Sequence, residues 1–254
     1  MARDRFDALG LPRIDAYVWG RAAALGEPAP AVVVAAFGVF EPTFLGAAYE
    51  RGRRAVERSV ILDARLDVAT TGLEHVLRDD REVAVLADLL LEATDDLDGV
   101  ARPLFSGLRG LPTPSTAHGR LWRGAELVRE HRGDGHLAVS LDQGLSGLEL
   151  NVLTELWLGY PLGEYAATRG FSPDRIDAAA DALVGRGWIA DHSLTEEGRR
   201  ARQTLEEATD RAQDVLVTRL GDRLDWAIAT ADRLSRQAVD AGAFPADSRK
   251  RAAG

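Results

Sequence analysis

The sequence contains no cysteine and a single lysine, Lys250, among its 254 residues. A chain without cysteine forms no disulfide and offers neither a thiolate metal ligand nor a cysteine nucleophile. Its apolar runs fall short of the roughly 20 residues that a membrane-spanning helix requires. Charged residues interrupt the N-terminal Met-Ala-Arg-Asp-Arg-Phe-Asp, where a secretory signal would be apolar. We therefore expect a cytoplasmic protein with no membrane segment.

Several cofactor and hydrolase motifs are missing as well. The chain has no Gly-x-Gly-x-x-Gly after a strand, no Gly-Lys-Ser/Thr phosphate loop and no Gly-x-Ser-x-Gly elbow, so the sequence names no cofactor. The spacing His-x-x-Asp-x-His from His131 to His136 contains metal-ligand residue types. Its glycines interrupt the helical face on which paired histidine ligands are usually carried, and we therefore expect no metal site.

Acidic residues dominate the charge: 40 acids stand against 31 basic residues, which gives a net charge of −9. This balance supplies no general electrostatic argument for a nucleic-acid partner, although a local basic face would still allow one. With 46% hydrophobic residues, the chain has the composition of a globular protein with one large or two small domains.

Apolar residues recur at helical spacing almost throughout, which predicts a mainly α fold. The two prolines of Leu111-Pro-Thr-Pro-Ser115 predict a linker over 111–118, between an N-terminal helical domain (1–110) and a C-terminal domain (119–254). We expect helices at about 14–24, 28–38, 42–56, 61–77, 80–95, 98–108, 119–132, 135–143, 147–158, 162–168, 173–186, 196–219 and 222–241.

Residues 156–205 follow the order of a helix-turn-helix with a hairpin behind it. A first helix ends at Gly170, and Ser172 and Pro173 suit the N-cap and the first position of a second helix. A short strand over Trp188–Asp191 then pairs with Ser193–Thr195. These features predict a winged helix with a two-stranded wing.

A weak internal repeat accompanies this segment. Residues 40–48 are similar to 159–167, and residues 65–73 are similar to 175–183. The repeat predicts two helix-turn-helix-like halves in one chain, of which only the second has a wing. Chance similarity among Ala-, Leu- and Arg-rich helices explains the pattern equally well.

Two resemblances rest on these and neighbouring residues. Gly185-Arg-Gly-Trp-Ile and Ser193-Leu-Thr-Glu-Glu-Gly198 resemble the winged helix of the multiple-antibiotic-resistance (MarR-type) regulators. The whole chain resembles an actinobacterial family of helix-turn-helix proteins of unknown function, most specifically in Arg129-Glu-His-Arg-Gly-Asp-Gly-His136. It departs from that family at Ala24 and Gly38, where proline and tyrosine are usual. The second resemblance implies a fold without an established activity.

The MarR resemblance implies that residues 172–186 form a DNA-recognition helix. The candidate DNA-binding residues are Ser172, Asp174, Arg175 and Arg186. Acids outnumber arginines in this helix, and the wing turn at 191–193 contains no arginine or lysine. Because phosphate neutralisation supplies most of the affinity for DNA, this charge argues against binding.

The densest polar cluster is 129–136, whose glycines predict a helix end or kink, with Asp134 as the N-cap of the next helix. Its acid–base groups are candidate catalytic residues: His131, Asp134 and His136. Charged and aromatic neighbours are candidate ligand-binding residues: Arg21, Trp122, Arg129, Glu130 and Arg132. The structural alternative is a helix terminus that ties two halves together through buried hydrogen bonds.

We therefore predict that the winged-helix fold has been adapted to bind a small molecule in an inter-domain cavity beside 129–136, as a monomer or homodimer. If the protein is an enzyme, the residues suggest acid–base chemistry by histidine. The alternative is a MarR-type transcription regulator. A third possibility is a module that binds a protein partner through the helix at 196–219.

Overall fold

The computed structural model describes residues 8–78 and 80–244 and is mainly helical, with one two-stranded antiparallel sheet in that part of the chain. The N-terminal segment used above to argue against a secretory signal lies outside the described residues, as does Lys250. Within them, no helix combines the length and apolar character needed to cross a membrane. The α-helices are α2 (Arg13–Ala22), α3 (Pro30–Phe37), α4 (Pro42–Ala55), α5 (Arg58–Val76), α6 (Asp80–Thr94), α7 (Pro103–Arg109), α8 (Ala117–Asp142), α9 (Gly147–Trp157), α10 (Glu164–Ala167), α11 (Pro173–Gly185), α12 (Glu196–Arg211), α13 (Asp214–Leu220) and α14 (Leu224–Asp240), with 3₁₀ turns η1 (Ala23–Leu25) and η2 (Gly221–Arg223).

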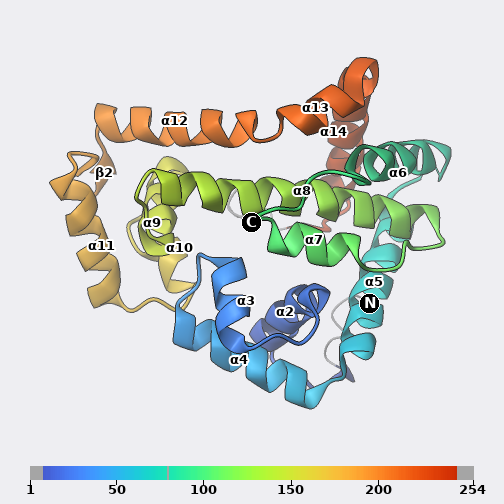
Figure 1. Cartoon of the computed structure of the whole chain (residues 1–254), viewed down its shortest axis with the longest axis horizontal. Helices are drawn as coiled ribbons and strands as arrows, with labels where there is room; N and C mark the ends of the chain where they lie inside the picture. The colour runs from blue at the N-terminus through green and yellow to red at the C-terminus, as the bar shows by residue number, and fades with distance from the viewer. Residues whose placement is uncertain (1–7, 79, 245–254) are drawn as a thin grey trace.

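The 26-residue helix α8 runs through the middle of the molecule, with α2, α3 and α4 on one side and α12 on the other (Figure 1). The hydroxyl of Thr116 caps its start by accepting the backbone N–H of Gly119 at 3.1 Å. The first half of α8 packs on α6, its most extensive helix contact, and α12 returns alongside its second half.

The predicted helix break at the glycines of the polar cluster is wrong, because α8 continues through Gly133 and Gly135 to Asp142. A Cβ at Gly135 would lie 2.8 Å from Nη1 of Arg102, which donates a hydrogen bond to the carbonyl of His131. Gly135 therefore marks the close approach of another segment to α8, and not a helix end.

The predicted capping role of Asp134 toward the residues that follow it is also wrong. Its Oδ2 accepts the backbone N–H of Phe105, 3.0 Å away, in the first turn of α7. The residue at the N-cap of α7, Arg102, makes no capping hydrogen bond with its side chain. Asp134 therefore caps a helix that is distant in sequence, and an acid at a helix N-terminus is electrostatically favourable.

Three apolar clusters form the core. One surrounds Trp19 and Tyr49 between α2, α3 and α4, and another joins α9, α10, α11, the hairpin and α12 around Leu183 and Leu205. The remaining cluster combines α6, α7, α8, α13 and α14. This third cluster includes residues from both sides of 111–118. That segment consists of the end of the loop after α7 and the first two residues of α8. The division into domains at this loop stays a prediction.

The predicted hairpin is confirmed. Strands β1 (Ile189–Ala190) and β2 (Ser193–Leu194) pair antiparallel, with Ile189 opposite Leu194. Ser172 occupies the N-cap position of α11 as expected, but its side chain makes no capping hydrogen bond. The predicted helix over 196–219 is wrong in one respect, because α12 ends at Arg211 and α13 begins at Asp214.

Candidate ligand-binding cavity

A cavity of about 510 Å³ lies where α2, α3, α8, α9, α10 and α12 meet; we call it the central cavity. Its aromatic lining residues are Tyr17, Phe37, Phe40, Trp157 and Tyr165. Its charged lining residues are Arg21, Arg129, Arg132, Arg169, Arg202, Glu130, Asp134 and Glu206. The guanidinium groups thus outnumber the carboxylates by two.

The continuous course of α8 explains how the 129–136 cluster reaches this cavity. Residues three and four apart share a helix face, so Arg129, Gly133 and His136 follow one another along the cavity wall. With α8 unbroken, the cluster is part of a rigid wall instead of a loop.

Arg21 from α2 reaches across to Glu130 of α8. Its Nε and Nη2 donate to the two carboxylate oxygens at 2.9 and 2.6 Å, and Arg129 donates to the same carboxylate at 2.7 Å. Burial alone would raise the pKa of Glu130, which is 1% exposed, but the hydrogen bonds from Arg21 and the charge of Arg129 hold that pKa below its usual range. Glu130 is therefore an ionised carboxylate whose oxygens are occupied.

Asp134 lies one turn further along α8 and is also buried. Oδ2 is occupied by the N–H of Phe105, while Oδ1 has no hydrogen-bond partner within the described chain. Burial raises the pKa of Asp134 to about 6, and the nearby Glu130 acts in the same direction.

His136 is a neutral imidazole with a defined tautomer. Its Nδ1 lies 2.8 Å from Oγ1 of Thr209, whose hydroxyl donates to the carbonyl of Leu205. Nδ1 therefore carries the proton and donates to Thr209, which leaves Nε2 as an acceptor. Burial lowers the pKa of His136 to about 4, and the charge of Arg202 adds to this effect.

Two cavity arginines were not predicted from the sequence. The guanidinium of Arg169 lies 4.8 Å from the ring centre of Phe40 and 4.5 Å from that of Tyr165, and it donates to the Tyr165 hydroxyl. It forms no ion pair with a described residue. Arg202 pairs with Glu206. In both arginines Nε is buried and has no acceptor among the described residues.

A sequence signal for Arg202 did exist. The buried positions of α12 are Gly198, Arg202, Leu205 and Thr209, so a charged residue stands within the buried stripe of an amphipathic helix. Arg169 lies in the turn before α11, where helical periodicity carries no information.

Two of the predicted site residues do not line the central cavity. His131 is 1% exposed, packs edge-on against the ring of Phe105 and has its Nδ1 2.8 Å from Oε1 of Gln213. Trp122 lies against the guanidinium of Arg65. The other candidate catalytic and ligand-binding residues do line the central cavity: Arg21, Arg129, Glu130, Arg132, Asp134 and His136. Their roles in binding or catalysis stay a prediction.

The surface of α11 offers DNA little positive charge. Arg175 pairs with Glu41 at 3.2 Å, and Arg186 donates to the backbone carbonyls of Gln143 and Gly144. Both arginines are thus engaged with the protein itself. Ser172 is exposed beside three exposed acids on the same helix: Asp174, Asp177 and Asp181.

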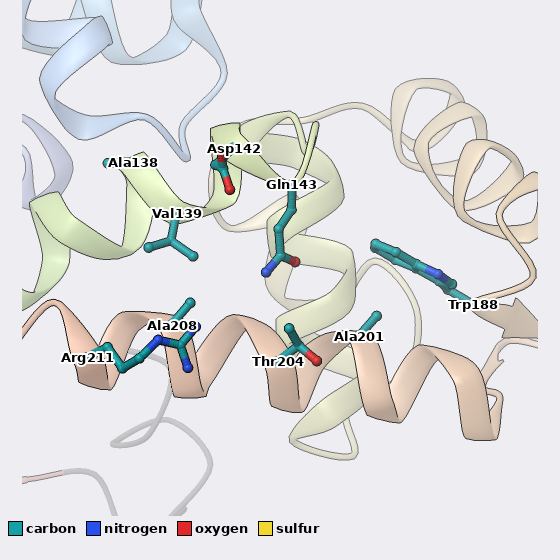
Figure 2. Close-up of a pocket in the computed structure, with 9 residues that line it drawn as sticks. All are labelled: Ala138, Val139, Asp142, Gln143, Trp188, Ala201, Thr204, Ala208 and Arg211. Carbon is teal, nitrogen blue, oxygen red and sulfur yellow. The ribbon is translucent and has the colours of Figure 1, made fainter.

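A shallower groove of about 730 Å³ separates the end of α8 from α12 (Figure 2). Asp142 and Arg211 are its only charged lining residues within the described chain. Three other lining residues, Ala138, Ala201 and Ala208, offer no polar side-chain group to a ligand. It contains none of the predicted catalytic, ligand-binding or DNA-binding residues. The described residues also gather no group of three or more histidine or carboxylate side chains that could hold a metal ion.

A mainly helical chain with two consecutive helices at a glycine turn and a hairpin behind them has the layout of a helix-turn-helix protein. The sequence pattern of the Helix-turn-helix family matches residues 1–245, and the chain belongs to that family. No curated protein and no solved structure matches the chain.

Proposed function

We propose that the chain binds an anionic small molecule in the central cavity. The carrying observation is the surplus of guanidinium groups there, five against three carboxylates. Arg169 in particular forms no ion pair with a described residue, and its guanidinium is held against the rings of Phe40 and Tyr165. An anion in the cavity would offset this excess of positive charge.

The phenol of Tyr17 supports a positive potential in this cavity. Burial would raise the pKa of Tyr17, yet the charges of Arg21, Arg169 and Arg129 lower it below its usual value. The same potential would attract a carboxylate or phosphate ligand.

Acid–base chemistry by histidine would have to use His136, since His131 is packed away from the cavity. Nε2 of His136 is an unprotonated acceptor held in place by the hydrogen bond from Nδ1 to Thr209. With a pKa of about 4 it is a weak base, which suits a hydrogen bond to the ligand better than proton abstraction. We therefore propose binding as the primary function.

The test is a thermal-shift screen of the full chain against small carboxylates and phosphates, because a ligand that binds the folded state raises Tm by mass action. Arg169→Gln should lose the shift. Arg175→Gln is the matched control, since Arg175 also stacks on an aromatic ring but lies outside the cavity, and it should keep the shift. If no anion raises Tm, or if both variants respond alike, the proposal fails.

The second candidate is a MarR-type regulator in which residues 156–205 contain the winged helix and residues 172–186, which include α11, read DNA. Membership of the Helix-turn-helix family and the order of helices and hairpin support it. The engaged arginines and exposed acids of α11 count against it. Affinity for duplex DNA that falls steeply with salt would favour this function, whereas a log–log slope near zero would exclude it.

A further inference from the structure

Several hydrogen-bonding atoms of the central cavity are accessible and still lack a partner among the described residues. Two are acceptors, Nε2 of His136 and Oδ1 of Asn151, and two are donors, Nη1 of Arg169 and Nη2 of Arg202. None of the four belongs to the fully buried atoms that the described chain leaves without a partner. Because their residues line a cavity of ligand size, these atoms indicate which groups the occupant should present.

We propose that the occupant is a polyhydroxylated anion, a sugar phosphate or a sugar acid, an inference that rests on the proposed binding function. Its anionic group would bind beside Arg169. Its hydroxyl groups would donate to His136 and Asn151, and one of them would accept a hydrogen bond from Arg202.

The two acceptors are fixed in that role. Nδ1 of His136 carries the ring proton because it donates to Thr209, so Nε2 can only accept. Nδ2 of Asn151 donates to the carbonyl of Val39 at 2.7 Å, which leaves Oδ1 as the free acceptor. The oxygens of an ionised carboxylate or phosphate have no proton to offer these atoms. The occupant should therefore carry donor groups in addition to its charge.

These donors should be neutral hydroxyl groups and not ammonium groups. Burial and the charges of Arg202 and Arg132 outweigh that of Glu206 and lower the pKa of His136 to about 4. Surroundings that disfavour the imidazolium would disfavour a cationic group of the ligand as well. A hydroxyl group can both donate to Nε2 of His136 and accept from Nη2 of Arg202, the arginine whose charge acts most strongly on this histidine.

Positive charge is in excess near Tyr17. Burial would raise the pKa of this phenol, but the charges of Arg21, Arg169 and Arg129 lower it. Arg21 and Arg129 share the carboxylate of Glu130, whereas Arg169 forms no ion pair with a described residue. A guanidinium donates in a planar fork that suits a carboxylate or a phosphate. The anionic group of the ligand therefore belongs beside Arg169.

Charge is more nearly balanced near His136. Arg202 pairs with Glu206, and Arg132 lies within 4 Å of both Glu206 and Asp210, at 2.6 and 3.6 Å. This part of the cavity suits the uncharged, hydroxylated part of the ligand.

The aromatic lining residues do not require a ring in the ligand, because they already have partners. Tyr17 packs on Phe40, and Trp157 lies against the guanidinium of Arg202. The cavity volume of about 510 Å³ is within the range typical of ligand pockets. The accessible polar atoms, and not these rings, therefore indicate the class of ligand.

The test is calorimetric titration of the full chain with two matched pairs of probes. Glucose 6-phosphate is paired with hexyl phosphate, and gluconate with hexanoate; the second member of each pair keeps the charged group and the six carbons but has no hydroxyl groups. In at least one pair the hydroxylated probe should bind at least about tenfold more tightly than its partner, because it makes the additional hydrogen bonds. The pair that shows this preference also tells a phosphate from a carboxylate ligand.

Neutral glucose is the control for the anionic group and should bind at least about tenfold more weakly than the favoured probe. If the hydroxyl groups bring no gain in either pair, the inference is wrong. It is equally wrong if glucose binds as tightly as the favoured probe.

Variants test the same assignments from the side of the protein. His136→Leu should remove the preference for the hydroxylated probe, whereas Arg169→Gln should weaken both members of the pair. His75→Leu replaces an exposed histidine of α5 outside the cavity and should keep the preference. A preference that persists in His136→Leu would overturn the inference. Should that variant fail to fold, the probe pairs on the unaltered protein still decide the question.

The two proposals can fail separately. If the anion screen finds a ligand but neither hydroxylated probe is preferred, the hydroxyl assignment is overturned and the anion-binding function stands. If no anion binds at all, both are overturned.

Discussion

Asp134 performs its structural work on a helix to which it does not belong. It caps α7 from the middle of α8, and its other oxygen is buried without a hydrogen-bond partner in the described chain. The groups around it are Glu130 on its own helix, Arg21 from α2, Arg102 before α7 and the backbone N–H groups of α7. Burial outweighs Arg21 and the backbone N–H groups, which favour the ionised carboxylate, and the pKa of Asp134 is therefore raised to about 6.

This raised pKa predicts a defined pH dependence of stability. The folded protein holds the Asp134 proton up to about pH 6, whereas the unfolded chain releases it near pH 4, so the contribution of Asp134 to stability is lost as the pH rises between these values. Asp134→Asn should therefore equal the wild type in urea unfolding at low pH and exceed it by about 1–3 kcal/mol at pH 7.5. An unchanged difference between the two pH values would contradict this, and Asp181→Asn is the control.

Glu130 should be indispensable while Arg21 is present. Removal of one member of a buried ion pair leaves an uncompensated charge and costs about 3–5 kcal/mol. We expect a loss of this order in the unfolding free energy of Glu130→Gln. The double variant Arg21→Met, Glu130→Leu should recover most of it, because neither member of the pair is left as a buried charge without its partner. A double variant as unstable as the single one would show that the loss has another origin.

Among the elements, α8 contains glycines of two kinds, which alanine substitution should affect in opposite directions. A Cβ at Gly133 would meet only the Glu130 carboxylate, at 3.8 Å, whereas a Cβ at Gly124 would lie 2.8 Å from Cβ of Leu90. Gly133→Ala should raise the unfolding free energy by about 1 kcal/mol through helix propensity. Gly124→Ala should lower it by about 1–3 kcal/mol through overpacking. If α8 were broken at the polar cluster, Gly133→Ala would destabilise the protein instead.

Periodicity and capping predicted most of the elements. Helix α11 begins at Pro173 as predicted, and the hairpin lies where the two short strands were predicted. The errors came from distance in sequence. Gly135 admits Arg102, and Asp134 caps α7, across about thirty residues of chain that no local pattern relates.

The sequence identified only part of the candidate site, for the same reason. The candidate residues of α8 lie in one segment and could be grouped from the sequence alone, and Arg21 was predicted as a further member. Arg169 and Arg202 come from a turn and from another helix, and only the tertiary fold brings them to α8.

For the molecule as a whole, the shared core of α6, α7, α8, α13 and α14 predicts cooperative unfolding. Trp19 lies in the core cluster of α2, α3 and α4, and Trp188 packs against the cluster around Leu183 and Leu205. In each single-tryptophan variant that retains one or the other, the thermal midpoint by fluorescence should equal the midpoint of the same variant by circular dichroism. Two separated midpoints would mean that the parts on either side of 111–118 unfold independently.

The packing of α8 on α6 also determines which part of the cavity wall would move when a ligand binds. One wall of the central cavity is the long helix α8, whose first half packs on α6 in the most extensive helix contact of the described chain. Another part of the cavity wall comes from the four-residue helix α10 and the glycine turn that follows it. A larger ligand would therefore displace α10 and the turn before α11 more readily than α8. The exposed acidic helix α11 would shift before α8 does.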